Sequence, residues 1–157
     1  MQTALDRIDF GILMSLQQDG RLSNKELAAK VGLAPSSCHA RVRRLRDDAV
    51  LGPCRASVAP EALGVGLQAI VFVHLQNHDR VQVEGFRDHV LALPEVVGLT
   101  HVGGRHDFLV HVAVRDARHL RDLALDELTS RPEVATVETS VVFEHVRGTM
   151  PLLATPG

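Results

Sequence analysis

The residues best suited to binding chemistry lie in a basic stretch between residues 21 and 46. This stretch holds seven Arg or Lys residues and a single acidic one, and Ser36 and Ser37 stand at the start of its most basic part. Arginines neutralise phosphates or hydrogen-bond guanine, and small hydroxyl side chains let a helix approach bases closely. The combination predicts contact with double-stranded DNA.

The distribution of charge along the chain supports this prediction. The 157 residues carry a net charge of −2, but the first 60 hold nine basic against six acidic residues, whereas the remainder holds eight against thirteen. A basic N-terminal part joined to an acidic remainder indicates that the first part meets a polyanion. With 45% hydrophobic and 23% charged residues, the chain can fold around a core.

Three helices are predicted to present this basic stretch. Apolar residues at helical spacing predict helices over 5–18, 23–32 and 35–48, the second starting with a Ser23–Glu26 capping box and the third with Pro35. A short helix, a glycine-containing turn and a basic third helix are typical of a helix-turn-helix. We expect a winged-helix-like form over residues 1–53. The alternative is a plain three-helix bundle whose arginines only keep it in solution.

The rest of the chain predicts a second, mixed domain. Residues 54–66 are expected to form a linker or short strand, residues 67–147 a domain, and residues 148–157 a tail. Strands are predicted at 67–76, 96–102, 107–114 and 136–146, with helices at 81–93 and 117–130. This β-α-β-β-α-β order predicts a ferredoxin-like domain with two helices on one face of an antiparallel sheet, and hence an α+β protein. A second copy would cover the other face.

The chain resembles the Lrp/AsnC (leucine-responsive regulator/asparagine regulator, feast/famine) family of bacterial transcription regulators. Four phrases carry the resemblance in the first half: LDRID at 5–9, ILxxLQxDGR at 12–21, SNKELAxxVGL at 23–33 and SxCxxRVRRL at 36–45. The second half is similar in its predicted topology and in the glycine turn of VGGRHDFLV at 102–110.

The resemblance implies a sequence-specific DNA-binding regulator that senses a small effector. The third helix would enter the major groove of DNA, and the second domain would form dimers that assemble into an octamer of four dimers. An amino acid, rather than a cofactor, would bind beside the glycine turn. The implied DNA contacts are Ser36, Ser37, His39, Arg41, Arg43 and Arg44, with Asn24 and Lys25 near phosphates. The implied effector contacts are Gly103, Gly104, Arg105, His106 and Asp107, with Glu138 and Thr139 as neighbours.

One departure from the family concerns the effector. Arg105 and His106 stand where many relatives carry an acidic residue followed by an aromatic one. A pair of hydrogen-bond donors favours a carboxylate or another polar group. The effector of a relative therefore does not transfer directly to this chain.

Two other kinds of DNA-binding protein remain as alternatives. One is a nucleoid-like architectural protein that bends DNA without an effector. The other is a metal-responsive regulator, suggested by His101, His106 and His111. Because a spacing of five places strand residues on opposite faces and a turn intervenes, these histidines define no compact ligand set, and no metal site is predicted.

Catalysis, secretion and membrane insertion find no support. Gly103-Gly104 lacks the surroundings of a phosphate-binding loop, and no Ser-His-Asp or Cys-His set is recognisable, so no enzyme is predicted. Cys38 and Cys54 do not define a disulfide framework. No apolar run approaches about 18 residues, and the first residues do not resemble a signal peptide, so we expect a cytoplasmic protein with no membrane partner.

Overall fold

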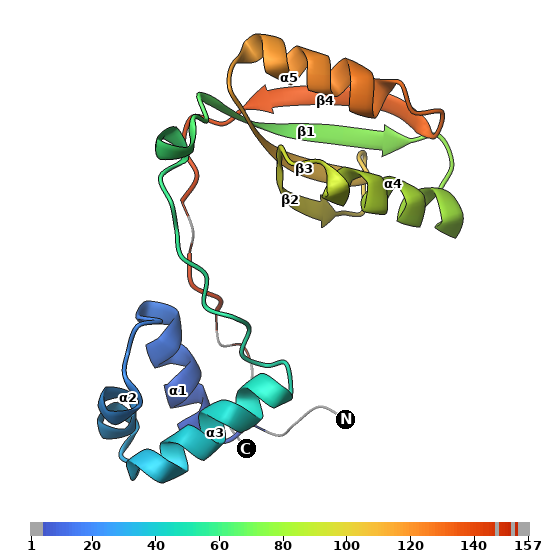
Figure 1. The fold of residues 1–157 in the computed structure, drawn as a ribbon. Coiled ribbons are helices and arrows are strands. Elements are labelled where there is room, and N and C mark those ends of the chain that lie inside the picture. The colour runs from blue at the N-terminus through green and yellow to red at the C-terminus, as the bar shows by residue number, and fades with distance from the viewer. Residues whose placement is uncertain (1–4, 147, 152, 154–157) are drawn as a thin grey trace. The chain divides into compact units, whose positions relative to one another are not determined.

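The computed structural model describes residues 5–146, 148–151 and 153, which form two compact units (Figure 1). The first unit contains the described residues up to Ala56 and those from Val146 onward, and the second contains Ser57–His145. In the first unit the backbone N–H of Met150 donates to the side-chain oxygen of Gln17 (2.8 Å). Met150 and Gln17, far apart in the sequence, therefore lie side by side in the first unit.

The first unit is built from three helices: α1 (Arg7–Gln18), α2 (Asn24–Val31) and α3 (Pro35–Asp47). Asp6 caps α1, and its carboxylate accepts the backbone N–H groups of Ile8 and Asp9, both at 2.9 Å. The predicted capping box of α2 is present. The α3 helix has no side-chain cap at Ala34 and begins at Pro35, whose fixed φ suits a first helical position. The three predicted helices are confirmed.

The core of this unit lies between the three helices. Ile12 from α1, Leu27 from α2 and Cys38 and Leu45 from α3 are almost fully buried. Burial raises the pKa of the Cys38 thiol, as expected for a cysteine that serves as a small apolar side chain. Residues 5–66 contain no strand, so the helix-turn-helix lacks the wing that the expected winged-helix-like form would require. The segment expected to be a linker also contains a 3₁₀ helix at Pro60–Leu63.

The second unit contains a four-stranded antiparallel sheet and two helices. In chain order its elements are β1 (Leu67–Leu75), α4 (Arg80–Ala92), β2 (Val96–His101), β3 (Phe108–Val114), α5 (Ala117–Leu123), a π-helical continuation (Ala124–Thr129) and β4 (Val134–Val141). The strands are arranged in the order β2-β3-β1-β4, and all neighbours are antiparallel. This is the predicted β-α-β-β-α-β fold. The last strand ends at Val141 rather than at the predicted residue 146.

The sheet buries one face under both helices. Alternate residues of β1 and β3 are buried, among them Val71, Val73 and Phe108, and they form one core with Phe86 of α4 and Leu120 of α5. Because neighbours across antiparallel strands point to the same side, the register separates two faces of the sheet. The residues between the buried ones, Gln68, Ile70, Phe72 and His74 of β1, point away from the helices.

No helix in the described part of the chain combines the length and apolar character needed to cross a membrane.

Candidate nucleic-acid interface and glycine turn

The outer face of α3 carries polar and basic side chains. Since Cys38, Val42 and Leu45 are buried and an α-helix turns about 100° per residue, the stripe opposite the core contains Ser36 and Arg43. Exposed on or beside this stripe are Ser36, Ser37, His39 and Arg43, all predicted to bind DNA, and Arg46, which was not among the predicted contacts. These five side chains form what we call the outer face of α3.

Arg43 is more exposed than Arg41 and Arg44, the other two arginines of α3 that form ion pairs. Its side chain is 78% exposed, and its Nε lies 3.7 Å from a carboxylate oxygen of Asp47, one turn later. An exposed pair of this kind contributes a few tenths of a kcal/mol, about 0.3–0.5. Arg43 can therefore exchange Asp47 for a phosphate or a guanine edge at little cost.

Arg41 and Arg44, which were also predicted to contact DNA, form ion pairs with acidic residues of the same unit. Arg41 Nη1 donates to Asp6 (2.6 Å) and to Asp9 (2.9 Å), and Arg44 Nη2 donates to Asp9 (2.6 Å). The Asp9 side chain is almost fully buried. The hydrogen bonds to Asp6 and Asp9 raise the pKa of Arg41, and the N–H of Asp9 together with Arg41 lowers the pKa of Asp6. These two arginines fasten α3 to the start of α1.

The two predicted phosphate contacts on α2 also differ from each other. Lys25 is exposed, as a phosphate contact requires. The side-chain amide of Asn24 instead donates to the backbone carbonyl of Pro35 (2.8 Å). Asn24 therefore joins the start of α2 to the start of α3 and sets the angle of the turn between them.

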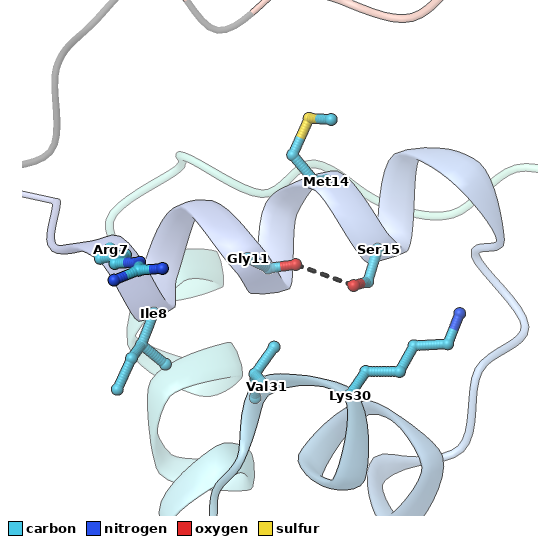
Figure 2. A pocket seen from close by; sticks show the side chains of 7 residues that line it. All are labelled: Arg7, Ile8, Gly11, Met14, Ser15, Lys30 and Val31. Atoms are coloured by element: carbon cyan, nitrogen blue, oxygen red, sulfur yellow. Dashed lines mark hydrogen bonds between the residues drawn. The ribbon is translucent and has the colours of Figure 1, made fainter.

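A hollow of about 610 Å³ lies between α1 and α2 in the same unit. Figure 2 shows Arg7, Met14 and Ser15 on the α1 side and Lys30 and Val31 on the α2 side. The Ser15 hydroxyl already donates to the carbonyl of Gly11 (2.8 Å). The hollow thus has a mixed polar and apolar lining with two cationic side chains, and we assign it no ligand.

The glycine turn lies in the second unit, between β2 and β3. Gly104 has a φ of 135°, a conformation that strongly favours glycine, and a side chain built at Gly103 or Gly104 would meet no atom within 4 Å. Arg105 is exposed and lies 3.1 Å from the carboxylate of Glu138. His106 packs on Phe72, and its Nδ1 is buried without a hydrogen-bond partner among the described residues. The turn therefore presents Arg105 to solvent and keeps the Nδ1 of His106 buried.

Asp107 does not belong to this open surface. One carboxylate oxygen accepts the backbone N–H of Leu75 (2.8 Å) and lies 2.9 Å from His74 Nδ1; the other lies 2.7 Å from His78 Nε2. Burial opposes ionisation of Asp107, but the bonds from Leu75, His78 and His74 outweigh it and lower its pKa. Asp107 was predicted to contact an effector; in this structure its side chain bonds to β1 and to the loop that follows β1.

Thr139 also departs from the predicted effector group. Glu138 pairs with Phe72 and Thr139 with Val71, so the two side chains lie on opposite faces of the sheet. Arg105 contacts Glu138 and thereby marks the side on which the turn lies. Glu138 stays beside the turn, whereas Thr139 points to the side of the helices.

The three histidines considered as metal ligands do not gather. His101 stacks on Phe108, His106 packs on Phe72, and the ring nitrogen of His111 lies 3.0 Å from the Gln68 side chain. Among the described residues a different group comes together: His74, His78 and Asp107, whose ligand atoms all lie within 4.8 Å of one another. The sequence analysis did not find this group, because its residues are about thirty positions apart and become neighbours only when β1 pairs with β3.

The comparisons with known proteins agree with this layout. Residues 5–46 match the AsnC-type helix-turn-helix domain, and residues 68–152 match the Lrp/AsnC ligand binding domain. The chain is 42% identical to the transcriptional regulator AldR of Mycolicibacterium smegmatis, covering 94% of this chain and 86% of that one. It is 38% identical to the leucine-responsive regulatory protein of Haemophilus influenzae, covering 93% and 88%.

Solved structures show the same fold. A transcriptional regulator from Neisseria meningitidis, solved as a complex with L-Met, superposes with a TM-score of 0.83 at 32% identity, covering 94% of this chain and 96% of that one. AldR of Mycobacterium tuberculosis superposes with a TM-score of 0.77 at 36% identity, covering 94% and 100%.

A helix-turn-helix unit joined to a ligand-binding sheet domain defines a DNA-binding transcription regulator, and the relatives are regulators rather than enzymes. The chain belongs to the Lrp/AsnC family.

Proposed function

We propose that this regulator recognises specific DNA sequences through the outer face of α3 and that an amino acid bound at the glycine turn modulates its assembly and DNA binding. The observation that carries the first part is the exposed stripe around Ser36 and Arg43, within the segment that matches the helix-turn-helix domain. Ser36, Ser37 and His39 are short enough to approach base edges, and Arg43 and Arg46 can reach phosphates or guanine.

The proposed interface differs from the sequence-based one in the roles of its arginines. Arg41 and Arg44 share the buried Asp9, so they act by holding α3 in place. Lys25 remains a phosphate contact, and Asn24 acts through the angle between α2 and α3. A dimer would present two α3 helices about 34 Å apart, so the operator is expected to be a rough palindrome.

The effector part of the proposal rests on the polar groups of the turn. Arg105 is paired with Glu138 only on the surface, and the buried Nδ1 of His106 lacks a partner among the described residues. Both suit a ligand carboxylate, which accepts hydrogen bonds from a guanidinium and a ring N–H. Asp107 is occupied by His74, His78 and Leu75, so an effector ammonium would have Glu138 as its acidic partner. The neisserial relative that was solved with L-Met supports an amino acid as the class of ligand.

Self-assembly is the third part of the proposal. Ile70 and Phe72 lie on the sheet face opposite the helices and are only half-buried within one chain. A second copy of the same face would remove this apolar surface from water and leave the sheet with a partner layer. We propose that such dimers assemble further into an octamer of four dimers.

The DNA part is tested by fluorescence anisotropy with a labelled operator at several salt concentrations. Arg43→Ala is expected to weaken binding and to reduce the salt slope by about 0.9 for each phosphate that the arginine neutralises. Arg87→Ala is the matched control, because Arg87 is an exposed arginine on α4 that pairs with its neighbour Asp88. Equal effects of the two substitutions, or none for Arg43→Ala, would remove the outer face of α3 from the interface.

The effector part is tested by a thermal-shift screen of the twenty amino acids. A ligand that binds only the folded chain raises the apparent stability by RT ln(1 + [L]/Kd), about 2.7 kcal/mol at a hundredfold excess over Kd. Arg105→Ala is expected to abolish the shift that the best ligand produces, while DNA binding without the ligand stays unchanged. A shift that survives Arg105→Ala would place the ligand elsewhere.

A further inference from the structure

His74, His78 and Asp107 form a compact group next to the glycine turn, and His74 lies at the end of the sheet face that we propose for self-assembly. His74 lies near the end of β1, His78 lies in the loop between β1 and α4, and Asp107 directly precedes β3. Their ligand atoms all lie within 4.8 Å of one another. We propose that these three side chains form a binding site for a divalent transition-metal ion, with zinc as the best fit.

The type and number of donors support this assignment. Two imidazole nitrogens and one carboxylate oxygen are a common ligand set for zinc, which binds them at about 2.0–2.2 Å in tetrahedral geometry. Donors around such an ion are about 3.3 Å apart, a distance that follows from those bond lengths. The present ring-nitrogen to carboxylate distances are 2.9 Å for His74 and 2.7 Å for His78. Each histidine would move about half an ångström away from the carboxylate oxygen that it faces, and the three donors, which lie within 4.8 Å of one another, would close around the ion.

The surroundings position the three donors unequally. The Asp107 side chain is nearly buried, and the backbone N–H of Leu75 fixes one of its oxygens, as groups behind a metal ligand commonly do. The His74 ring is held by the sheet, whereas the His78 side chain is 58% exposed on a loop. The fixed pair would bind first and the His78 ring would close over the ion, leaving a fourth position for water or another ligand.

Metal binding would replace hydrogen bonds that exist now. Because an ionised carboxylate only accepts hydrogen bonds, each ring nitrogen that faces ionised Asp107 must carry the N–H of that bond. To bind an ion, each ring must shift that proton to its other nitrogen or lose it to solvent, while the carboxylate supplies a lone pair. The ion would then link the end of β1, the following loop and the start of β3.

The test uses the full-length chain, treated with a chelator and titrated with Zn²⁺ and with Co²⁺. Calorimetry is expected to show one ion per chain, and Co²⁺ is expected to give the visible absorption of tetrahedral coordination. His78→Gln is expected to weaken binding by more than about a hundredfold, since even groups behind the ligands contribute about 10–100-fold. This variant should fold, because His78 lies on an exposed loop. His101→Ala, a substitution of a histidine that stacks on Phe108, is the matched control and should bind like the parent.

Binding that is unchanged in both His78→Gln and Asp107→Asn would overturn the proposal, and so would the absence of stoichiometric binding by the parent chain. Loss of binding in His101→Ala but not in His78→Gln would place the ion elsewhere. In the first two cases the three residues only fasten the loop to the sheet. These readouts involve no DNA, so their failure would leave the proposed regulatory function untouched.

Discussion

Asp9 in the first turn of α1 is the residue whose replacement tests the structure of the first unit most directly. Its side chain is 1% exposed and accepts hydrogen bonds from Arg41 (2.9 Å), from Arg44 (2.6 Å) and from the backbone N–H of Asp6 (3.1 Å). The substitution Asp9→Asn keeps the shape of the side chain. It removes the negative charge that both guanidinium groups share and places an amide N–H where only an acceptor fits.

The expected cost follows from the burial of each partner. Removing one member of a buried ion pair costs about 3–5 kcal/mol. Here Arg41 keeps Asp6, and the Arg44 side chain is 43% exposed, so both cations retain some stabilisation. We therefore expect the free energy of unfolding to fall by about 3 kcal/mol, at the lower end of that range. In a domain of 60–100 residues this lowers Tm by about 12–24 °C.

Far-ultraviolet circular dichroism during urea or thermal unfolding is the suitable assay, because the chain contains neither Trp nor Tyr. Asp47→Asn is the matched control: Asp47 also pairs with an arginine of α3, but at 3.7 Å and with a 68% exposed side chain. Its replacement should change the free energy of unfolding by less than about 0.5 kcal/mol. Equal losses for the two variants, or a loss below about 1 kcal/mol for Asp9→Asn, would refute the role assigned to Asp9.

Three further predictions concern the second unit. A Cβ at Gly66 would lie 2.3 Å from the carbonyl oxygen of Arg115, so Gly66→Ala should lower the free energy of unfolding in urea by about 1–3 kcal/mol. Gly85→Ala, in the open middle of α4, should instead raise the free energy of unfolding by about 0.5–1 kcal/mol. If Gly85→Ala destabilised the protein more than Gly66→Ala, the close contact between Gly66 and the backbone of Arg115 would be refuted. Gly104→Ala should strain the glycine turn by about 1–3 kcal/mol and reduce the thermal shift that the effector produces. Gly103→Ala should leave the stability and the thermal shift unchanged. Equal effects of the two substitutions would contradict the positive φ at Gly104. The lowered pKa of Asp107 means that its ionised form stabilises the fold above the ordinary carboxyl pKa, about 3.9, and that this contribution is lost as pH falls through the lower folded value. When urea unfolding is measured at several acidic pH values, the free energy of unfolding should therefore fall less with decreasing pH in Asp107→Asn than in the parent. An identical dependence on pH in the two proteins would show that Asp107 does not cause the loss of stability in acid.

Local chemistry made the elements of the fold predictable. The Ser23–Glu26 capping box and Pro35 mark helix starts with side-chain chemistry that acts within one turn, and both starts are where the sequence placed them. Alternating apolar residues in β1 and β3 likewise predicted which face of the sheet is buried. The end of β4 was less predictable, because residues 142–146 (VFEHV) still contain bulky apolar side chains, although the strand register with β1 ends at Val141 and the N–H of Val142 donates to the carbonyl of Gln68.

Contacts between distant residues account for what the sequence could not show about the candidate sites. Arg41, Arg43 and Arg44 differ little as sequence positions, yet only the packing of α1 against α3 brings Asp9 beside two of them. The exact strand register likewise separates Glu138 from Thr139, since adjacent residues of a strand point to opposite faces.

The sequence by itself determined the three-helix unit, the order of strands and helices, the family and the basic character of α3, because caps, periodicity and charge act over a few residues and are written in consecutive positions. Tertiary structure alone decided which arginines of α3 are engaged by Asp9, and on which face of the sheet the glycine turn and Glu138 lie. It also brought His74, His78 and Asp107 together. The physical reason is that these features depend on where a folded backbone places side chains from separate elements, and on the burial that makes such encounters strong.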